Sequence, residues 1–236
     1  MTTVAKAHRE AVLASHFLLR HLPPEELRRL AAEAQVVRYP RGAIIFKKGD
    51  PGSSLMAVIR GRVKVCTYSA DGRELVLNIF GQGGLFGEIA VLDGRPRTAD
   101  AVVLEETDLL VLARSHLLPL LTGNPEVVGR LLAVLCQRLR QASEHLEDAL
   151  LREAPSRIAR GLLRLAETFG QAKPGGGIRL DIKLSQQQLG NLIGVSRESI
   201  NRQLGDWAHA GHLTMEEGRI LIRDRALLER IAETEA

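Results

Sequence analysis

The spacing of apolar residues changes once along the chain, at Asn124–Pro125, and this change constrains the fold more than any other feature. From Val36 to Ala113 the apolar residues form short runs rich in Val, Ile and Leu, separated by glycines at turn positions. After Pro125 their spacing becomes helical. Strands with no helical segments between them argue against βαβ units. The sequence predicts an α+β chain, in which an antiparallel β-roll or jelly-roll-like domain precedes helices.

The residues ahead of the β-rich region read as helical. In PPEELRRLAAEA, prolines open a turn and two glutamates lie in the first helical turn. No apolar run reaches the ~18 residues that span a bilayer, and the N-terminus lacks the pattern of a signal peptide. We therefore expect a cytoplasmic protein with no membrane partner.

Composition excludes several classes of site. Cys66 and Cys136 lie far apart with no CxxC, which argues against zinc, an iron–sulfur cluster or a disulfide framework. We expect no metal site. The formal net charge of +4 permits nucleic-acid binding, whereas 3% aromatic residues argue against a base-stacking surface.

A heptad repeat runs through the helical region and predicts a homodimer. The spacings of 4, 3, 4, 3, 4 and 3 are typical of a two-stranded coiled coil. The alternative is a long amphipathic helix packed on its own domain, with Leu131 and Leu150 as additional apolar contacts. The repeat consists of Val128, Leu132, Leu135, Leu139, Ala142, Leu146 and Ala149.

A helix break and hinge are expected near residues 152–155, because proline disfavours helix in the residue before it. SRIARGLLRLAETFG then predicts a helix, QAKPGGG a flexible loop and IRLDIKL an alternating strand. The expected domains are 1–123, the β-roll with N-terminal helices; 124–153, the dimerisation helix; and 156–236, a DNA-binding domain.

The last domain carries a helix-turn-helix pattern. Ser185 with Gln188 is a capping-box signature, Gly194 supplies a turn, and Ser196 can cap a second helix. HLTMEEGRILIRD then predicts two strands around a Glu-Glu-Gly turn, which would form a small wing. The expected interior residues of the two helices are Leu189, Leu192, Ile193, Val195, Ile200, Leu204 and Trp207.

The second helix exposes groups that read base edges and phosphates, so double-stranded DNA is the expected partner. Arginine can read guanine bidentately and glutamate can accept from cytosine. From Ser156 onward 12 Lys/Arg face 10 Asp/Glu, an excess of 2, so any basic surface must be local. The predicted DNA contacts are Ser185, Gln186, Ser196, Arg197, Glu198, Ser199, Asn201 and Arg202.

The segment FGEIAVLDGRPRTADA in the β-rich region predicts an anion site. A short helix and loop can turn backbone N–H groups and the Arg97 guanidinium toward one cyclic phosphate, which suits the fork of arginine. Glu88 can accept from a ribose 2′-hydroxyl, and Gly87 permits close approach of the backbone. The alternative is a surface loop with an Arg–Glu pair. An enzyme using Glu88 as a base is disfavoured, because no second catalytic group lies near it in sequence.

A β-roll, a dimer helix and a winged helix-turn-helix, in that order, resemble the cAMP receptor protein (CRP/FNR) family of transcription regulators. The blocks GDPGSSLMAVIRGRVKV, FGEIAVLDGRPRTADA and LGNLIGVSRESINRQL carry the resemblance. It implies a regulatory cyclic nucleotide in place of a cofactor, DNA and RNA polymerase as partners, and no enzymatic activity. It assigns the ligand site to Gly87, Glu88, Ile89, Ala90, Arg97, Thr98 and Ala99, supported by Arg138.

The identity of the base stays open. In cAMP-binding relatives a Thr-Ser pair on the dimer helix contacts adenine, and this chain has Ala142 and Ser143 there. Half of that contact is absent. The resemblance favours cAMP, with cGMP next because Thr98 can bond a guanine. The remaining alternatives are a member with a vestigial pocket and ligand-independent DNA binding, and one that responds to a cyclic dinucleotide.

Overall fold

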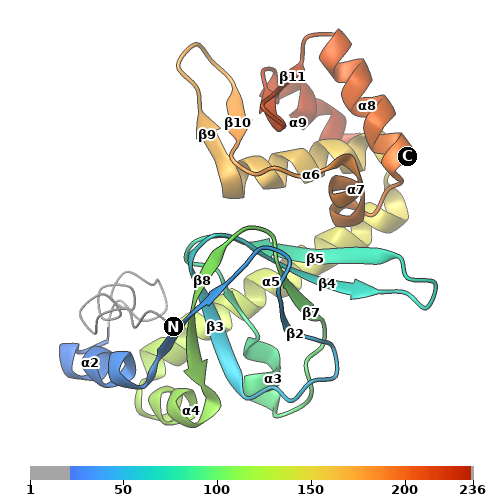
Figure 1. Cartoon of the computed structure of the whole chain (residues 1–236). Helices are drawn as coiled ribbons and strands as arrows, with labels where there is room; N and C mark the ends of the chain where they lie inside the picture. The colour runs from blue at the N-terminus through green and yellow to red at the C-terminus, as the bar shows by residue number, and fades with distance from the viewer. Residues whose placement is uncertain (1–21, 235–236) are drawn as a thin grey trace. The chain divides into compact units, whose positions relative to one another are not determined.

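The computed structural model describes residues 22–234, and these divide by their internal contacts into two units (Figure 1). The first unit extends to Arg73 and continues from Leu77 to Leu139, and the second contains residues 74–76 and everything from Arg140 onward. Of the predicted N-terminal helices, α2 (Pro24–Glu33) is present, with Glu25 and Glu26 in its first turn. The part predicted ahead of residue 22 lies outside the described residues.

Eight strands form the β-roll that the sequence predicts. Two four-stranded sheets have the orders β1-β8-β3-β6 and β2-β7-β4-β5. The β1–β8, β3–β8 and β4–β7 pairings are antiparallel. The strands are β1 (Gln35–Tyr39), β2 (Ile44–Phe46), β3 (Ser54–Arg60), β4 (Val63–Tyr68), β5 (Glu74–Phe80), β6 (Leu85–Phe86), β7 (Asp100–Val103) and β8 (Thr107–Ala113).

The sheet that contains β3 and β8 is buried on both faces. Met56, Val58 and Leu109 point into a core shared with the other sheet. Their neighbours Leu110 and Leu112 belong to a second core, which α2, α4 (Arg114–Gly123) and the start of α5 (Pro125–Leu151) cover. Because both faces are covered, these strands read as continuous apolar runs rather than as alternating ones. The sequence analysis did not predict α4.

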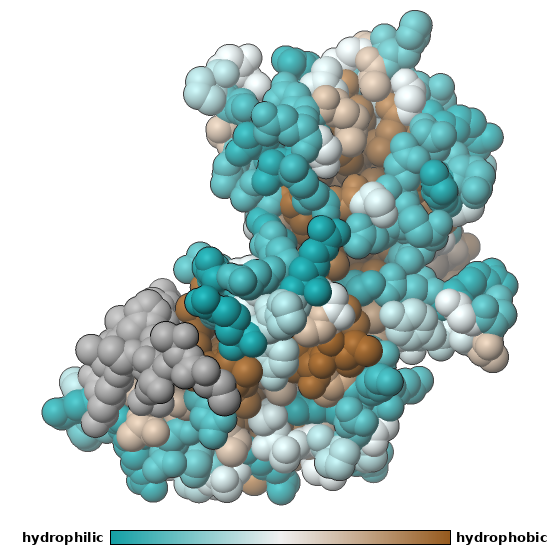
Figure 2. Space-filling view, viewed as in Figure 1, coloured by the Kyte–Doolittle hydropathy of each residue, from teal (hydrophilic) through white to brown (hydrophobic). Residues whose placement is uncertain are grey.

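Helix α5 has apolar residues on two sides. Val127 and Leu131 are buried in the core of the first unit. The predicted repeat instead presents exposed side chains: Leu132 is 54% exposed, Leu139 70% and Leu146 60%. Of the two additional leucines, Leu131 packs on its own domain whereas Leu150 is exposed. On the face that Figure 2 shows, most surface is hydrophilic and brown apolar areas interrupt it on both units.

The second unit is a winged helix-turn-helix. Its sheet has the order β11-β12-β10-β9, so the two expected strands of the wing are joined by the strand expected at 178–184 and by β9, which was not predicted. The sequence analysis did not predict α9. The elements are α6 (Ala154–Phe169), β9 (Gly170–Ala172), β10 (Ile178–Leu180), α7 (Gln186–Ile193), α8 (Arg197–His209), β11 (Leu213–Glu216), β12 (Arg219–Ile222) and α9 (Arg225–Glu233).

For two elements of the second unit, a loop and a strand, the predicted residue bounds were wrong. The predicted loop at 171–177 begins inside strand β9, which pairs with β10. All of β9 is exposed, so its backbone pairing leaves no mark on the apolar pattern. The predicted strand at 178–184 ends at Leu180, which pairs with the first residue of β9, Gly170; beyond it the neighbouring segment is the end of α6. The helix break is confirmed, since α5 ends at Leu151 and α6 begins at Ala154.

Candidate functional site

Gly87 begins the candidate ligand site. It follows β6 and precedes α3 (Glu88–Asp93) with φ of 80°, a left-handed conformation that favours glycine. A Cβ at this position would lie 2.6 Å from Nη1 of Arg97. Glycine therefore allows α3 to begin directly beside the guanidinium, and it brings Gly87, Glu88 and Arg97 together as the sequence predicts.

The Arg97 guanidinium lies beneath this turn. Nη1 donates to the Gly87 carbonyl at 2.7 Å. Nη2 donates to the Ser54 carbonyl at 2.7 Å and to the Ser54 hydroxyl at 3.3 Å. The guanidinium also lies 4.2 Å from the ring centroid of Phe46, within the range of a cation–π contact.

Arg97 is more buried than the sequence analysis expected. The residue is only 5% exposed, so its guanidinium contacts the protein rather than facing outward. Backbone carbonyls and the Phe46 ring offset the cost of burying the charge. Its buried Nε has no hydrogen-bond partner among the described residues. Burial lowers the pKa of the Arg97 guanidinium, and the carboxylates of Glu88 and Asp50 oppose this shift.

Glu88 and Arg138 form the second charged pair of the site. The Glu88 side chain is 2% exposed, and its carboxylate forms an ion pair with the Arg138 guanidinium. Arg138 also donates to the Leu85 carbonyl and lies 5.0 Å from the ring centroid of Phe80. The structure thus brings Arg138, which the sequence analysis placed in a supporting role, into direct contact with Glu88.

The loop at residues 49–53 backs the site. The Gly49 N–H donates to the Arg97 carbonyl, and the Arg97 N–H donates to the Asp50 carbonyl, both at 2.8 Å. Gly52 lies against α3, because a Cβ placed on it would be 2.0 Å from Cβ of Ala90. The backbone of this loop therefore packs directly against Ala90 of α3, and a side chain at residue 52 would separate them.

The remaining predicted ligand residues differ in exposure. Ile89 and Thr98 are exposed, whereas Ala90 and Ala99 are buried and serve packing. Ala142 and Ser143 are exposed on the part of α5 that belongs to the second unit. Their contact with a base remains a prediction.

In the second unit, both predicted helix caps are present. The Ser185 hydroxyl accepts from the Gln188 N–H at 3.1 Å, and the Gln188 side chain accepts from the Ser185 N–H at 2.9 Å. Ser196 caps α8 by accepting from the Ser199 N–H at 3.1 Å. The expected inner face of α8 is confirmed, since Ile200, Leu204 and Trp207 are buried.

The outer face of α8 presents the polar groups expected to meet DNA. Asn201 accepts a hydrogen bond of 3.0 Å from the Gln186 amide, so residues of α7 and α8 form one polar surface. Ser199 is only half-exposed, and its hydroxyl bonds that of Ser196 at 3.0 Å. The exposed residues of this face are Arg197, Glu198, Asn201 and Arg202.

Several supporting residues escaped the sequence analysis. Ser54 and Phe46 contact Arg97 from distant strands, and nothing local in sequence marks them. Gly52 lies in a GDPG segment, which signalled a turn but not an approach to α3. Within residues 22–234, no helix combines the length and apolarity that crossing a bilayer requires.

Comparisons with known proteins agree with this order of domains. Residues 36–124 match the family model of the cyclic nucleotide-binding domain, and residues 156–231 match that of the Crp-like helix-turn-helix domain. A "CRP-like cAMP-activated global transcriptional regulator" of Mycobacterium tuberculosis is 35% identical over 223 residues, which cover 94% of this chain and 99% of that protein. The "Cyclic AMP receptor protein" of Thermus thermophilus is 36% identical over 215 residues, which cover 91% of this chain and 96% of that protein.

Among solved structures, the chain is similar to the "c-di-GMP Responsive Global Regulator CLP" of Xanthomonas campestris. The TM-score is 0.71 at 25% identity, and the match covers 85% of this chain and 99% of that one.

Proposed function

The chain belongs to the CRP/FNR family, which consists of transcription regulators rather than enzymes, and we propose that it is a homodimer controlled by a cyclic nucleotide. It binds pseudo-palindromic DNA in the cytoplasm and contacts RNA polymerase there. The observation that carries the ligand proposal is the joint placement of Arg97 and Glu88 against Gly87. A buried arginine beside a buried carboxylate offers one group for a cyclic phosphate and one for a ribose hydroxyl.

When the ligand binds, the Arg97 guanidinium exchanges backbone carbonyl partners for the phosphate of the ligand. The guanidinium is already removed from water and held by neutral carbonyls of Gly87 and Ser54. A phosphate oxygen is a stronger acceptor than a carbonyl because it carries negative charge, and phosphate can pair bidentately with the guanidinium fork. The unpartnered Nε gives the arginine a further donor for that anion.

Among the ligands, we favour cAMP. The names of the Mycobacterium and Thermus relatives specify cAMP. Ala142 cannot donate a hydroxyl, which weakens selection for adenine, and the exposed Thr98 suits a guanine. cGMP is therefore the second candidate. The resemblance to the Xanthomonas regulator keeps a cyclic dinucleotide as the third.

Calorimetric titration of the ligand-stripped full-length protein with cAMP, cGMP and cyclic di-GMP tests the proposal. We expect binding of cAMP, and loss of most of it in Arg97→Gln. Arg95→Gln is the matched control, because Arg95 is an exposed arginine two residues away. If none of the three nucleotides binds and none changes DNA affinity, the ligand-independent alternative replaces this proposal.

For DNA reading, we propose that the exposed face of α8 enters the major groove, with two copies reading half-sites about 34 Å apart. Arg197→Ala should cost about 1–3 kcal/mol of specific binding and much less of non-specific binding. Arg225→Ala is the control, because Arg225 is an exposed arginine on α9, outside α7 and α8. An equal loss of specific and non-specific affinity in Arg197→Ala contradicts base reading by this residue.

A further inference from the structure

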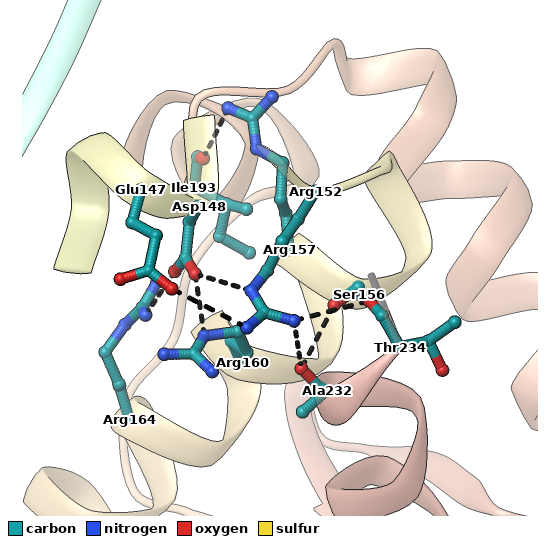
Figure 3. Close-up of polar contacts among 10 residues, drawn as sticks. All are labelled: Glu147, Asp148, Arg152, Ser156, Arg157, Arg160, Arg164, Ile193, Ala232 and Thr234. Atoms are coloured by element: carbon teal, nitrogen blue, oxygen red, sulfur yellow. Dashed lines mark hydrogen bonds and ion pairs between the residues drawn. The ribbon is translucent and has the colours of Figure 1, made fainter. Parts of the chain in front are cut away.

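Asp148 is a buried carboxylate near the end of α5, only 4% exposed. Its Oδ1 lies 2.7 Å from Nε of Arg160, and its Oδ2 lies 2.7 Å from Nη1 of Arg164. Arg160 and Arg164 are four residues apart, so they lie on the same face of α6. Figure 3 shows both side chains converging on Asp148. Since a buried charge persists only when it is paired, this face of α6 holds the end of α5.

Arg152 extends the contacts to the end of α9. It lies in the two-residue connection between α5 and α6, and its Nε is 3.4 Å from Oδ1 of Asp148. Its Nη1 donates to the carbonyls of Ala232 at 3.0 Å and Thr234 at 3.3 Å. The Ser156 hydroxyl also donates to Ala232, at 3.2 Å (Figure 3). These donors satisfy carbonyls at the C-terminal end of α9, where a cation is favourable.

Arg157 connects α6 to the turn of the helix-turn-helix. Its Nη2 donates to the Gly194 carbonyl at 2.7 Å and to the Ile193 carbonyl at 3.2 Å. This turn lies between α7 and α8, so its position sets where α8 begins. Helix α8 is the one proposed to enter the major groove. Residues of α6 therefore contact the end of α5, the end of α9 and the turn that precedes α8.

From these contacts we infer that Asp148 is a positioning residue, which makes the last turn of α5 part of the DNA-binding unit. The sequence pattern predicts a hinge at residues 152–155. The contacts of Arg152 and Asp148 instead make this connection a rigid joint, and any movement that a ligand causes must pivot upstream of Asp148 in α5. The orientation of α8 then follows the last turn of α5. Only the effect on ligand response rests on the proposed function.

Hydrogen exchange on the full-length protein without ligand tests the rigid joint. In the wild type, amides of residues 146–151 should exchange as slowly as those in the middle of α6. Asp148→Asn keeps the shape and removes the charge, and it should speed exchange at 146–151 by at least about tenfold while the middle of α6 keeps its protection. Glu147→Gln is the matched control, because Glu147 is half-exposed and its carboxylate lies 3.8 Å from Nη2 of Arg152.

DNA binding with and without cAMP tests the positioning role. We expect Asp148→Asn to bind cAMP and non-specific DNA as the wild type does, and to lose at least about fivefold of the enhancement of specific binding by cAMP. A residue that only stabilises the fold would leave that ratio unchanged. If Asp148→Asn does not fold, hydrogen exchange and DNA binding are measured on Arg164→Lys instead. This variant keeps the positive charge and loses the planar guanidinium.

Unchanged exchange at 146–151 in Asp148→Asn, or an equal change in Glu147→Gln, overturns the rigid joint. An intact enhancement by cAMP in Asp148→Asn overturns the positioning role. If the wild type shows no enhancement by any cyclic nucleotide, the proposed function fails, and the exchange measurement still decides the joint.

Discussion

Replacing Gly52 with alanine should separate the loop at 49–53 from α3 and so weaken the ligand site. The added Cβ would lie 2.0 Å from Cβ of Ala90 and 3.1 Å from its Cα. Carbon atoms meet at about 3.5 Å, so one backbone must move by about 1.5 Å. Overpacking of this kind costs about 2–3 kcal/mol of the free energy of unfolding. The backbone of Gly52 is not in the left-handed region, so steric overlap is the whole reason.

A second substitution separates overlap from other causes. Ala90→Gly removes the Cβ that Gly52→Ala would strike, and alone it should cost about 1 kcal/mol through lower helix propensity. If the two effects were independent, the double variant would lose about 3–4 kcal/mol. Because the shorter side chain makes room for the longer one, we expect the double variant to lose only about 1–2 kcal/mol, a coupling of about 2 kcal/mol.

Urea unfolding followed by far-UV circular dichroism measures the four proteins of this cycle. The single tryptophan, Trp207, is buried in the second unit, and its native fluorescence checks that this unit is folded in each variant. Affinity for cAMP should fall in Gly52→Ala and recover in the double variant. Additive losses, within about 0.5 kcal/mol, would refute the argument that loop and helix meet at these two residues.

Three further outcomes are expected. Leu139→Lys should raise the dimer dissociation constant at least about 100-fold in sedimentation experiments, since each protomer would bury one such leucine; Leu150→Lys, equally exposed but outside the repeat, should remain dimeric. Burial lowers the pKa of His145, and the nearby charge of Arg164 lowers it further. His145 therefore binds a proton more readily in the unfolded chain than in the folded protein. The wild type should therefore lose stability relative to His145→Gln as pH falls from about 7.5 to about 5.5, and a difference independent of pH would contradict this. Ser185→Ala should cost about 1 kcal/mol in urea unfolding followed by Trp207 fluorescence, and no change would mean that the capping box adds nothing.

Local patterns predicted much of the second unit. The two serine caps are marked by residues within three positions of each other, and the burial of Ile200, Leu204 and Trp207 follows from helical spacing. Both features depend on one helix and its first turn. Both features can therefore be predicted from the local sequence.

The parts that escaped prediction depend on distant partners. The direction of the Arg97 side chain is set by the carbonyl of Ser54, 43 residues earlier in the chain. Asp148 lies in a helix whose repeat indicated a dimer, and its pairing with Arg164 appears only once α6 folds back beside it. Strand β9 is fully exposed and is held by backbone pairing with β10 and by a hydrogen bond from Arg179 to Gln171, so the pattern of apolar residues does not record it.

The exposed leucines of α5 have a consequence for how the protein responds to its own abundance. A lone protomer presents Leu132, Leu139 and Leu146 to water, a surface that pairing with a second copy would cover. If only the pair occupies an operator, occupancy at low expression rises with the square of the protomer concentration. A twofold change in gene dosage would then change promoter occupancy about fourfold by mass action. The level at which the cell makes this chain is in that case a second input, beside the cyclic nucleotide.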